Sequence, residues 1–364
     1  MKRMKRAMAV AVAMLVGSAI LPAASGAETI KVKTTIADAI AQASDGDTIV
    51  VPPGTYEQGG LVVTQDDLTI RGSKSAVLDA EGHSIGLRIG ADTITGDPPQ
   101  CPAFTVDNFT LEGLTIQNAS FTGIFLIGVD GFRVTRGRYI DNEEYGIFPR
   151  CARDGLIDHN FGDGGVETGE TGLDATVYVG VDDEITVKNN KLVGGTIGIE
   201  LENTTNSVVR NNKLTDNVNG ILVVVLPNLP TTSTEDALIE RNVINSNNVP
   251  NPFPLPPPLD DPLQLLPSGS GILNVGGDAI TMRRNVVNKN NSFGIGIVEN
   301  PFGFGPPDDN VVVDNTVKNN AGDPDVRATL SADIAYDGSG TNNCFAGNVF
   351  DTDDPPGIVS AFPC

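Results

Sequence analysis

Tryptophan is absent from this 364-residue chain, and aromatic residues make up only 5% of it. Histidine occurs twice, methionine five times and cysteine four times. Because so few soft or imidazole ligands are available, a copper-handling role lacks support. The scarcity of aromatic rings also argues against tight sugar binding by stacking at many sites.

Basic residues are scarce as well. The chain has 24 lysines and arginines against 46 acidic residues, a formal net charge of −22. Such a negative field repels nucleic acid and anionic lipid, and it favours divalent cations and solubility. We therefore expect no nucleic-acid partner. Export into a salty medium explains the charge as well as a cation-binding role does.

After residue 27 the chain lacks any apolar run of the roughly 20 residues that a membrane span requires. Residues 1–27 instead combine four basic residues, an apolar stretch at 7–21 and the small residues Ser25-Gly26-Ala27. This order is typical of a secretory signal peptide cleaved near Ala27. We expect a secreted or periplasmic monomer. Its mature chain has 20 basic and 46 acidic residues and a net charge of −26.

Two signatures alternate along the rest of the chain. One is a Gly-Ile pair followed by apolar alternation, at Gly123-Ile124, Gly146-Ile147, Gly198-Ile199, Gly220-Ile221, Gly271-Ile272 and Gly294-Ile295. The other is a strand that closes on asparagine, at Asn160, Asn190, Asn212, Asn242, Asn285 and Asn315. Successive Gly-Ile pairs are 22 or 23 residues apart where no insertion intervenes. A fixed period of this length with period-2 strands predicts an all-β parallel β-helix solenoid.

We expect one solenoid domain over residues 28–364, closed at both ends. Residues 34–56 predict an N-terminal cap, in which a short helix at 34–43 covers the first coil. Residues 340–364 predict a C-terminal cap. Four cysteines in an oxidising compartment should pair. Cys344 and Cys364 would close the C-terminal cap, and the repeat register places Cys101 and Cys151 on one edge, two coils apart.

Insertions are predicted at only two corners, one on each side of the Gly-Ile strand. They make the sheet of Gly-Ile strands the floor of a walled groove, where function is expected. The largest insertion, at 248–270, is rich in proline and cannot join the sheet. Its leucines favour a wall or lid lying on the solenoid over a free tether. The asparagine column predicts an internal amide ladder, and His159 beside it is interpreted as a solvated corner residue.

The strongest candidate site lies on the Gly-Ile strands. Alternation directs Glu200 and Glu202 out of the cylinder, about 6.6 Å apart. The register also predicts an exposed aromatic strip, formed by Phe125, Phe148 and Tyr178, on which sugar rings could stack. Beside that strip, Gly180 would leave a gap between Arg150 and Glu202. We assign Arg150, Tyr178 and Glu202 as catalytic candidates and Phe125, Phe148 and Glu200 as substrate-binding candidates.

An acidic insertion precedes these strands and carries Asp163, Glu167, Glu170 and Asp174. Asp174 with Glu200 and Glu202 could hold Ca²⁺, because calcium prefers hard oxygen ligands. The alternative is purely structural. The aromatic side chains could pack beneath the insertion, and the glutamates could pair with Arg150 or remain solvated.

The segment Asp-Gly-Asp-Thr-Ile-Val-Val-Pro-Pro-Gly-Thr-Tyr at 45–56, together with the Asn and Gly-Ile coils, resembles the right-handed parallel β-helix superfamily of pectate lyases, alginate lyases and mannuronan epimerases. The segments Tyr178-Val179-Gly180 and 198–203 resemble uncharacterised exported members. The resemblance implies the right-handed fold and a polysaccharide ligand. The Asp-Pro-His-Asp and Gly-His-Gly motifs of characterised members are missing.

Two functions follow. The first is a polysaccharide lyase or C5-epimerase acting on an acidic glycan, in which Arg150 or Ca²⁺ neutralises the sugar carboxylate while Tyr178 or Glu202 moves protons. The second is a non-catalytic protein that binds a glycan or a surface, or is purely structural.

Overall fold

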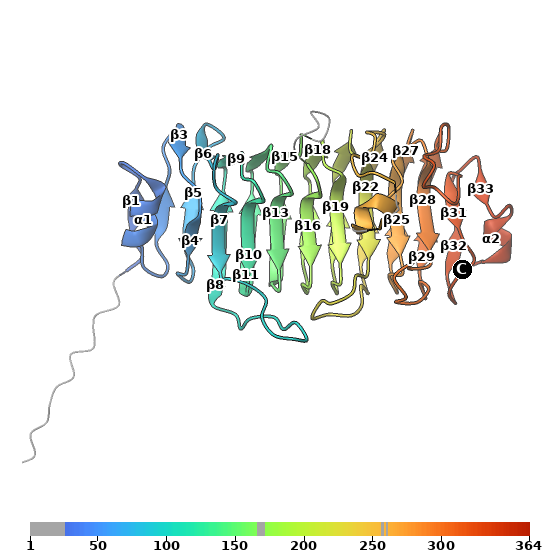
Figure 1. The fold of residues 1–364 in the computed structure, drawn as a ribbon, viewed down its shortest axis with the longest axis horizontal. Coiled ribbons are helices and arrows are strands. Elements are labelled where there is room, and N and C mark those ends of the chain that lie inside the picture. The colour runs from blue at the N-terminus through green and yellow to red at the C-terminus, as the bar shows by residue number, and fades with distance from the viewer. Residues whose placement is uncertain (1–25, 166–171, 256–257, 260) are drawn as a thin grey trace, which may run out of the picture.

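The computed structural model describes residues 26–165, 172–255, 258–259 and 261–364. The predicted signal peptide falls almost entirely outside the described residues. Within them the strands stack along one long axis, from the N-terminal end to the C-terminal end (Figure 1). Every pair of neighbouring strands within the three sheets is parallel, which confirms the parallel β-helix. No helix in the described ranges is long and apolar enough to cross a bilayer.

The first sheet has 12 strands. In order they are β1 (Thr29–Lys31), β2 (Thr48–Val50), β5 (Thr69–Arg71), β8 (Val106–Glu112), β11 (Val129–Thr135), β14 (Arg153–Asp158), β17 (Thr186–Lys188), β20 (Val208–Arg210), β23 (Leu238–Glu240), β26 (Thr281–Arg283), β29 (Val311–Val313) and β32 (Cys344–Ala346). The second sheet has ten strands. They are β3 (Gly54–Glu57), β6 (Ala76–Asp79), β9 (Thr115–Gln117), β12 (Arg138–Ile140), β15 (Phe161–Asp163), β18 (Lys191–Val193), β21 (Lys213–Thr215), β24 (Val243–Asn245), β27 (Val286–Asn288) and β30 (Thr316–Lys318).

The third sheet, which we call the Gly-Ile sheet, has 11 strands. They are β4 (Leu61–Val63), β7 (Ile85–Gly90), β10 (Thr122–Ile127), β13 (Tyr145–Arg150), β16 (Ala175–Gly180), β19 (Ile197–Glu202), β22 (Asn219–Val224), β25 (Ser270–Val275), β28 (Phe293–Val298), β31 (Ile334–Tyr336) and β33 (Asp353–Asp354). Its inward side chains form a stack that is at most 1% exposed, comprising Ile124, Ile147, Val177, Ile199, Ile221, Ile272, Ile295 and Ile334. Each such side chain contributes about 1.5–3 kcal/mol on burial.

Both ends of the cylinder are covered. Helix α1 (Ile36–Gln42) closes the N-terminal end, as predicted: the Thr35 hydroxyl accepts a hydrogen bond from the Asp38 amide, and Ile36 and Ile40 are buried. At the other end, helix α2 (Ile358–Ala361) packs beside β32. These caps cover the inward apolar stack where the coils stop.

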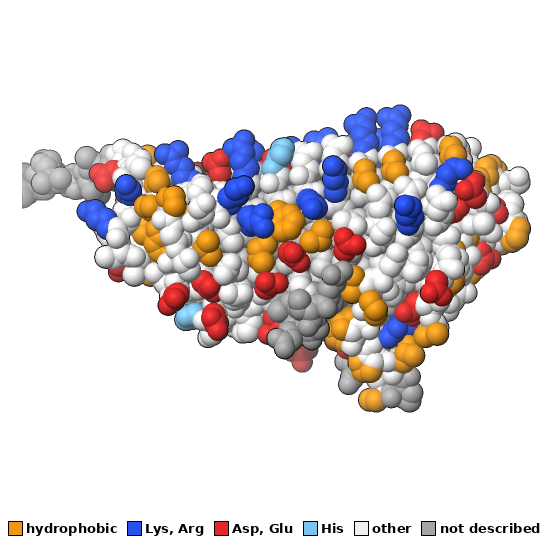
Figure 2. All heavy atoms as spheres, turned by 90° about the horizontal axis from the view of Figure 1, so that it is seen from above, with side chains coloured by type: hydrophobic (Ala, Val, Ile, Leu, Met, Phe, Trp, Pro, Cys, Tyr) orange, Lys and Arg blue, Asp and Glu red, His pale blue; other side chains and the backbone are white. Residues whose placement is uncertain are grey.

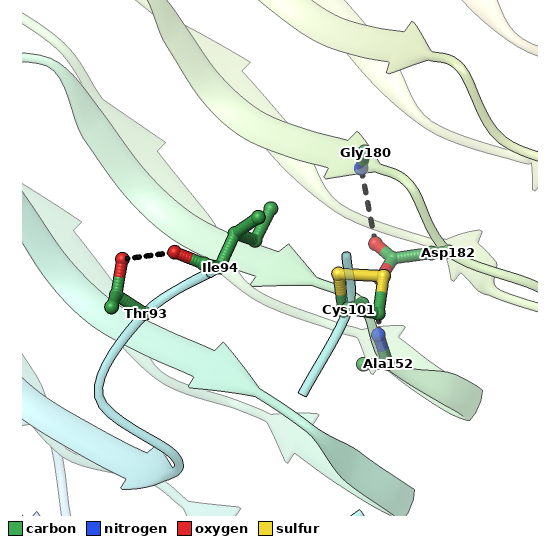
Figure 3. Close-up of a disulfide and its surroundings, with 7 residues drawn as sticks. Thr93, Ile94, Cys101, Ala152, Gly180 and Asp182 are labelled. Atoms are coloured by element: carbon green, nitrogen blue, oxygen red, sulfur yellow. Dashed lines mark hydrogen bonds between the residues drawn. A yellow bond between two sulfur atoms is a disulfide. The ribbon is translucent and has the colours of Figure 1, made fainter. Parts of the chain in front are cut away.

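The structure forms both predicted disulfides. Cys101 bonds to Cys151, with Cα atoms 5.6 Å apart, and Cys344 bonds to Cys364, with Cα atoms 4.8 Å apart. Beside the first disulfide, the buried Asp182 carboxylate accepts hydrogen bonds from the amides of Ala152, at 2.6 Å, and Gly180, at 3.0 Å (Figure 3). The disulfide therefore ties the insertion after β7 to the corner after β13.

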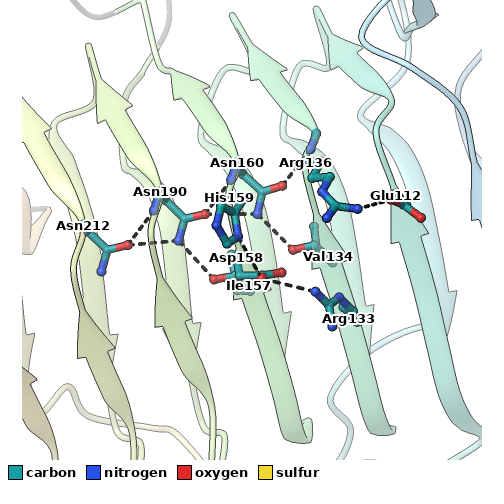
Figure 4. Close-up of polar contacts among 11 residues, drawn as sticks. Glu112, Arg133, Val134, Arg136, Ile157, Asp158, His159, Asn160, Asn190 and Asn212 are labelled. Atoms are coloured by element: carbon teal, nitrogen blue, oxygen red, sulfur yellow. Dashed lines mark hydrogen bonds and ion pairs between the residues drawn. The ribbon is translucent and has the colours of Figure 1, made fainter.

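The asparagine ladder is confirmed. Each side-chain amide donates to the amide oxygen of the next coil at 3.0–3.1 Å, in the order Asn160, Asn190, Asn212, Asn242, Asn285 and Asn315. Figure 4 shows the first three of these residues. The same amides also donate to backbone carbonyls of the preceding coil. A second ladder was missed in the sequence, although each member lies five residues after a member of the first: Asn217, Asn247, Asn290 and Asn320, ending on Asp333.

The proline-rich insertion is a wall, as predicted. It contains the short 3₁₀ helix η2 (Pro262–Leu265), and Leu266 behind it is only 5% exposed. Arg327, from the segment before β31, donates to the carbonyl oxygens of Phe253, at 2.8 Å, and Gln264, at 2.9 Å. These contacts hold the insertion against the outer face of the Gly-Ile sheet.

Candidate functional site

The outer face of the Gly-Ile sheet carries the candidate site. Its register matches the prediction, since Tyr178 lies opposite Glu200 and Gly180 opposite Glu202. Successive side chains in a strand point to opposite faces, so both glutamates project out of the cylinder. They are nevertheless buried: Glu200 is 3% exposed and Glu202 is 8% exposed. Their expected contact with solvent is therefore wrong.

The predicted aromatic strip is also covered, so the expectation of exposed stacking rings is wrong. Phe125, Phe148 and Tyr178 are 8%, 1% and 2% exposed. The ring of Phe121 packs edge-on against Phe148, with centroids 5.6 Å apart, and the Tyr145 ring stacks on Phe148 at 4.2 Å. Neither ring belongs to the strip, because Phe121 lies directly before β10 and Tyr145 is the first residue of β13. Phe125 and Phe148 therefore present no exposed ring on which a sugar could stack.

The expected gap over Gly180 is filled by a neighbouring ring. A Cβ atom on Gly180 would lie 2.0 Å from the Tyr178 hydroxyl oxygen, so the tyrosine side chain crosses directly above this glycine. The same hydroxyl donates to Glu202 Oε1 at 2.7 Å. Glycine at 180 thus makes room for Tyr178 to reach Glu202.

Arg150 is placed beside this contact, on the strand next to Gly180. Its guanidinium lies 5.9 Å from the centroid of the Phe148 ring. The Arg150 Nε atom is buried and has no hydrogen-bond partner among the described residues. The structure therefore brings Arg150, Tyr178 and Glu202 to one region, although an open gap does not separate Arg150 from Glu202.

A cluster of three carboxyl groups occupies the centre of the region. We call it the carboxyl cluster: Asp174, Glu200 and Glu202. Asp174 and Glu200 interact through their carboxyl groups, and the Tyr145 hydroxyl donates to Asp174 Oδ2 at 2.5 Å. Glu200 Oε2 and Asp174 Oδ1 are buried without a hydrogen-bond partner in the described part of the chain. The cluster is therefore incompletely satisfied.

Burial makes the cluster unusually basic. Burial raises the pKa of Asp174 to about 7, although the hydrogen bond from Tyr145 opposes this shift. Burial also raises the pKa of Glu200 well above its usual value, and the neighbouring negative charges of Asp174 and Glu202 add to the effect. Burial raises the pKa of Glu202 as well, against the Tyr178 hydrogen bond and the positive Arg150. The cluster therefore retains protons near neutral pH.

The carboxyl cluster forms one end of a cavity of about 420 Å³, a size typical of ligand sites. Its floor continues along the Gly-Ile sheet over the outward side chains Leu222, Val224, Leu273, Val275, Gly296, Val298 and Ala335. The proline-rich insertion forms one wall. Residues 299–302 and 327–330 form others. Figure 2 shows the insertion projecting at the lower right, with hydrophobic and acidic side chains gathered at its base.

The cavity lining is acidic as well as aliphatic. Beyond the cluster it includes the carboxyl groups of Asp261, Glu299 and Asp337. Arg327 is the one basic residue among the described lining residues, and it pairs with Asp325 at 3.1 Å. Of the candidates predicted from sequence, Glu200, Glu202 and Asp174 line this cavity, whereas Arg150, Tyr178, Phe125 and Phe148 lie behind or beside it.

The predicted calcium site is not pre-assembled. Among the described residues, no group of three or more histidine, cysteine, aspartate or glutamate side chains is arranged to hold a metal ion. The cluster fits calcium poorly in this geometry, because burial raises the pKa values of Asp174 and Glu200, and Glu202 accepts a hydrogen bond from Tyr178. Glu167 and Glu170 of the predicted set lie outside the described residues. Calcium binding stays a prediction.

Tyr145 and the cavity wall at 327–330 were missed in the sequence. Tyr145 immediately precedes Gly146-Ile147, and its hydroxyl reaches Asp174 on the next coil. An aromatic residue directly before a Gly-Ile pair recurs at Phe293, which also lines the cavity. This recurring position was the available signal. The wall formed by the proline-rich insertion was predicted, whereas no repeat in the sequence pattern places the wall at 327–330.

Comparison with known proteins identifies the fold. A family model described as "Right handed beta helix region" matches residues 59–225 and 103–302. The A-module of the mannuronan C-5 epimerase AlgE6 from Azotobacter vinelandii is similar in structure, with a TM-score of 0.57, 17% identity, and coverage of 86% of this chain and 82% of that one. No curated protein matches the sequence significantly.

Two further solved structures share the architecture. An alginate lyase from a Paenibacillus species has a TM-score of 0.57 and 15% identity, covering 86% of this chain and 99% of its own. A family 28 exopolygalacturonase from Yersinia enterocolitica has a TM-score of 0.56 and 13% identity, covering 88% and 68%. At these identities the likeness shows the fold.

Proposed function

This chain belongs to the family of right-handed β-helix regions, and we propose that it is an exported enzyme that acts on a polysaccharide by acid–base chemistry in the cavity on its Gly-Ile sheet. The names of the three similar structures support a glycan as the ligand, because each is an enzyme of polysaccharides. One fold hosts many chemistries, so the proposal depends on the site itself.

The observation that carries the proposal is the carboxyl cluster at the end of the cavity. Burying three carboxyl groups beside one another disfavours the folded state, because each loses hydration and repels the others when ionised. A structural role needs no such arrangement on the outside of a solenoid whose core is already complete. Buried acids with raised pKa values at the edge of a cavity are instead characteristic of acid–base sites.

The contacts assign different roles, acid and base, to the carboxyl groups of the cluster. Glu200 has the more strongly raised pKa and lines the cavity, so it is the acid available to a leaving oxygen. Glu202 is the candidate base. Burial raises its pKa, but the hydrogen bond from Tyr178 and the charge of Arg150 limit this rise and favour its ionised form more than that of Glu200. Burial raises the pKa of Tyr178 well above 10, so Tyr178 acts as a hydrogen-bond donor rather than as a phenolate.

Two reaction types fit this assignment. In a lyase or epimerase, Glu202 would remove the proton at C5 of a uronate, and Arg150 would neutralise the sugar carboxylate, as the sequence predicts. In hydrolysis, one protonated and one ionised carboxyl group act on either side of the glycosidic bond. The cavity lining offers no unpaired cation among its described residues, which favours a reaction that does not require one.

The proposed export is supported by the two disulfides and by the sequence of residues 1–27. Expression with the native N-terminus in a bacterial host, followed by N-terminal sequencing of the exported protein, tests it. We expect the mature chain to begin near Glu28. Retention of the intact chain in the cytoplasm would contradict export.

The catalytic proposal is tested by incubating the purified protein with a panel of acidic, neutral and basic polysaccharides. Unsaturated ends report elimination, new reducing ends without unsaturation report hydrolysis, and NMR reports epimerisation. We expect one of these products with the wild type and a loss of about 100-fold or more with Glu200→Gln. Addition of calcium or a chelator shows whether the predicted ion contributes.

A non-catalytic glycan-binding protein is the second candidate. The low exposure of the carboxyl cluster favours it, because Glu200 and Glu202 meet a ligand only at the end of the cavity. Saturable binding of an oligosaccharide that is recovered unchanged, equally with the wild type and with Glu200→Gln, would support this candidate over the enzyme.

A further inference from the structure

We propose that the cavity selects a positively charged glycan, one whose sugar units carry free amino groups. The proposal rests on the proposed function in one respect, that the ligand is a glycan, and it names the chemical class of that glycan. It differs from the acidic substrate that the sequence predicts.

The charges around the cavity are the first argument. Six carboxyl side chains line it within the described part of the chain, and they come from five separate segments: Asp174, Glu200, Glu202, Asp261, Glu299 and Asp337. The one described basic residue of the lining, Arg327, is already occupied. It pairs with Asp325 and donates to the carbonyl oxygens of Phe253 and Gln264. An anionic sugar would therefore meet carboxylates without a free counter-charge.

The unsatisfied carboxyl oxygens are the second argument. Glu200 is 3% exposed and lines the cavity, and its Oε2 atom has no hydrogen-bond partner among the described residues. Asp174 Oδ1 is buried and unpartnered in the same way. An ammonium group presents three donors and no acceptor. It would satisfy both oxygens and offset the repulsion within the cluster.

The floor of the cavity accepts the rest of the sugar. Leu222, Leu273 and Val275 present aliphatic surface that suits the C–H faces of a pyranose ring. Gly296 and Ala335, farther along the same row, leave depth because their side chains are small. The cavity thus combines carboxylates with an aliphatic floor. This combination matches a sugar that has one cationic substituent and an apolar ring face.

The wider charge distribution acts in the same direction. The whole chain has a net charge of −22. Within the described strands of the Gly-Ile sheet, arginine and lysine occur only at Arg88 and Arg150, and Arg88 is paired with Asp92. Most lysine and arginine side chains in Figure 2 lie instead in the upper half of the face shown, away from the projecting insertion. A polycation would be steered toward the cavity side.

Calorimetric titration with three oligosaccharides of equal length tests the proposal. The probes are glucosamine oligomers, their N-acetylated counterparts and galacturonate oligomers, at a pH at which the amines are protonated. We expect the glucosamine oligomer to bind at least about ten-fold more tightly than the N-acetylated one, and the galacturonate oligomer to bind weakest. Raising the salt concentration should weaken the glucosamine complex most.

Variants outside the carboxyl cluster locate the effect. Asp261→Asn keeps a side chain that can cap η2, and Glu299 is exposed, so Glu299→Gln should not disturb folding. We expect each to weaken glucosamine binding about three-fold, and the double variant about ten-fold, while leaving the affinity for the N-acetylated oligomer unchanged. The matched control is Glu57→Gln in β3. It removes one exposed negative charge away from the cavity and should have no effect.

Equal or tighter binding of the N-acetylated or galacturonate oligomer overturns the proposal, and so does an equal effect of Glu299→Gln and Glu57→Gln. The proposed function fails separately. Selective binding of the glucosamine oligomer without any product would refute catalysis and support this inference. Conversion of a neutral or acidic glycan would support catalysis and refute this inference. Failure to bind any of the three probes would count against both.

Discussion

The asparagine ladder and the carboxyl cluster are both buried polar networks, and they differ in every other respect. In the ladder, each amide both donates to and accepts from its neighbours, so the chain of contacts is closed except at its ends. In the cluster, carboxyl oxygens are left without partners, and the groups compete for protons. The ladder lies inside the cylinder, whereas the cluster lies on its outer face beneath added segments.

This difference separates the network that stabilises the solenoid fold from the network that is placed to bind a ligand. A satisfied network of neutral amides stabilises the folded state and needs no ligand. An unsatisfied network of acids destabilises it and gains most from a ligand. The two regions should therefore respond to substitution in opposite ways. Variants of the ladder should lose stability and keep function, whereas variants of the cluster should lose function and keep stability.

The largest effect on stability is expected in the middle of the ladder. Asn212 Oδ1 accepts hydrogen bonds from the backbone and side-chain amides of Asn190, and its Nδ2 donates to Val187 and Asn242. Asn212→Ala leaves several fully buried groups unpaired, so we expect a loss of about 3–5 kcal/mol in the free energy of unfolding. Denaturant titration measures it. An exposed control, Asn206→Ala, should cost much less, and a loss below about 1 kcal/mol for Asn212→Ala would remove the ladder's assigned role.

The cluster should show the reverse pattern. Glu200→Gln preserves the shape of the side chain and removes an acid that burial already disfavours. We expect turnover to fall by about 100-fold to 10,000-fold, while the free energy of unfolding at neutral pH stays the same or rises. Turnover assays and denaturant titration on the same preparation check both parts. A marked loss of stability with full activity would show that Glu200 has a structural role, and it would contradict the proposed difference between the ladder and the cluster.

The pH dependence of stability tests the difference between the two networks, and the measurement requires no ligand. The pKa of Asp174 is about 7 in the folded state, against about 4 for an unfolded aspartate. The folded state therefore holds a proton that the unfolded state has released, and its stabilisation is present below about pH 4 and lost as the pH rises through 7. We expect a decrease of about 1.4 kcal/mol per pH unit from this group within that window. Asp174→Asn should flatten the curve in denaturant titrations across the window.

A second aspartate serves as the control of opposite sign. Burial tends to raise the pKa of Asp158, but its interactions with Thr135 and His159 and the charge of Arg133 lower it overall (His159 and Arg133 are drawn in Figure 4). Its contribution is present above the unfolded pKa and lost as the pH falls through the folded value. Asp158→Asn should therefore reduce stability at neutral pH and not at strongly acidic pH. The same slope for both variants would contradict the assignment for Asp174.

The ladder could be predicted from the sequence, and the covering of the cluster could not. Asparagine recurs at fixed steps, and in a solenoid equal steps place side chains on one line. The same logic placed Tyr178 beside Glu200 correctly. Exposure does not follow from register, because it depends on what lies above the sheet. Phe121 and Tyr145 cover the aromatic strip, and the insertion at 248–270 forms the cavity wall, through contacts that occur once each.

The smallest expected effect is on stability, and it distinguishes two buried tyrosines: Tyr145 beside the carboxyl cluster and Tyr139 in the core of the cylinder. The Tyr145 hydroxyl donates to Asp174, which favours the ionised aspartate, whereas the Tyr139 hydroxyl is buried in the core with no partner among the described residues. Tyr145→Phe should raise the pKa of Asp174 further and move the pH dependence of stability to higher pH, with a loss of about 1 kcal/mol at neutral pH. Tyr139→Phe should leave the pH dependence unchanged, because the hydroxyl that it removes makes no hydrogen bond. Parallel denaturant titrations of the two variants measure the difference, and identical shifts would mean that the Tyr145 hydroxyl does not set the protonation of the cluster.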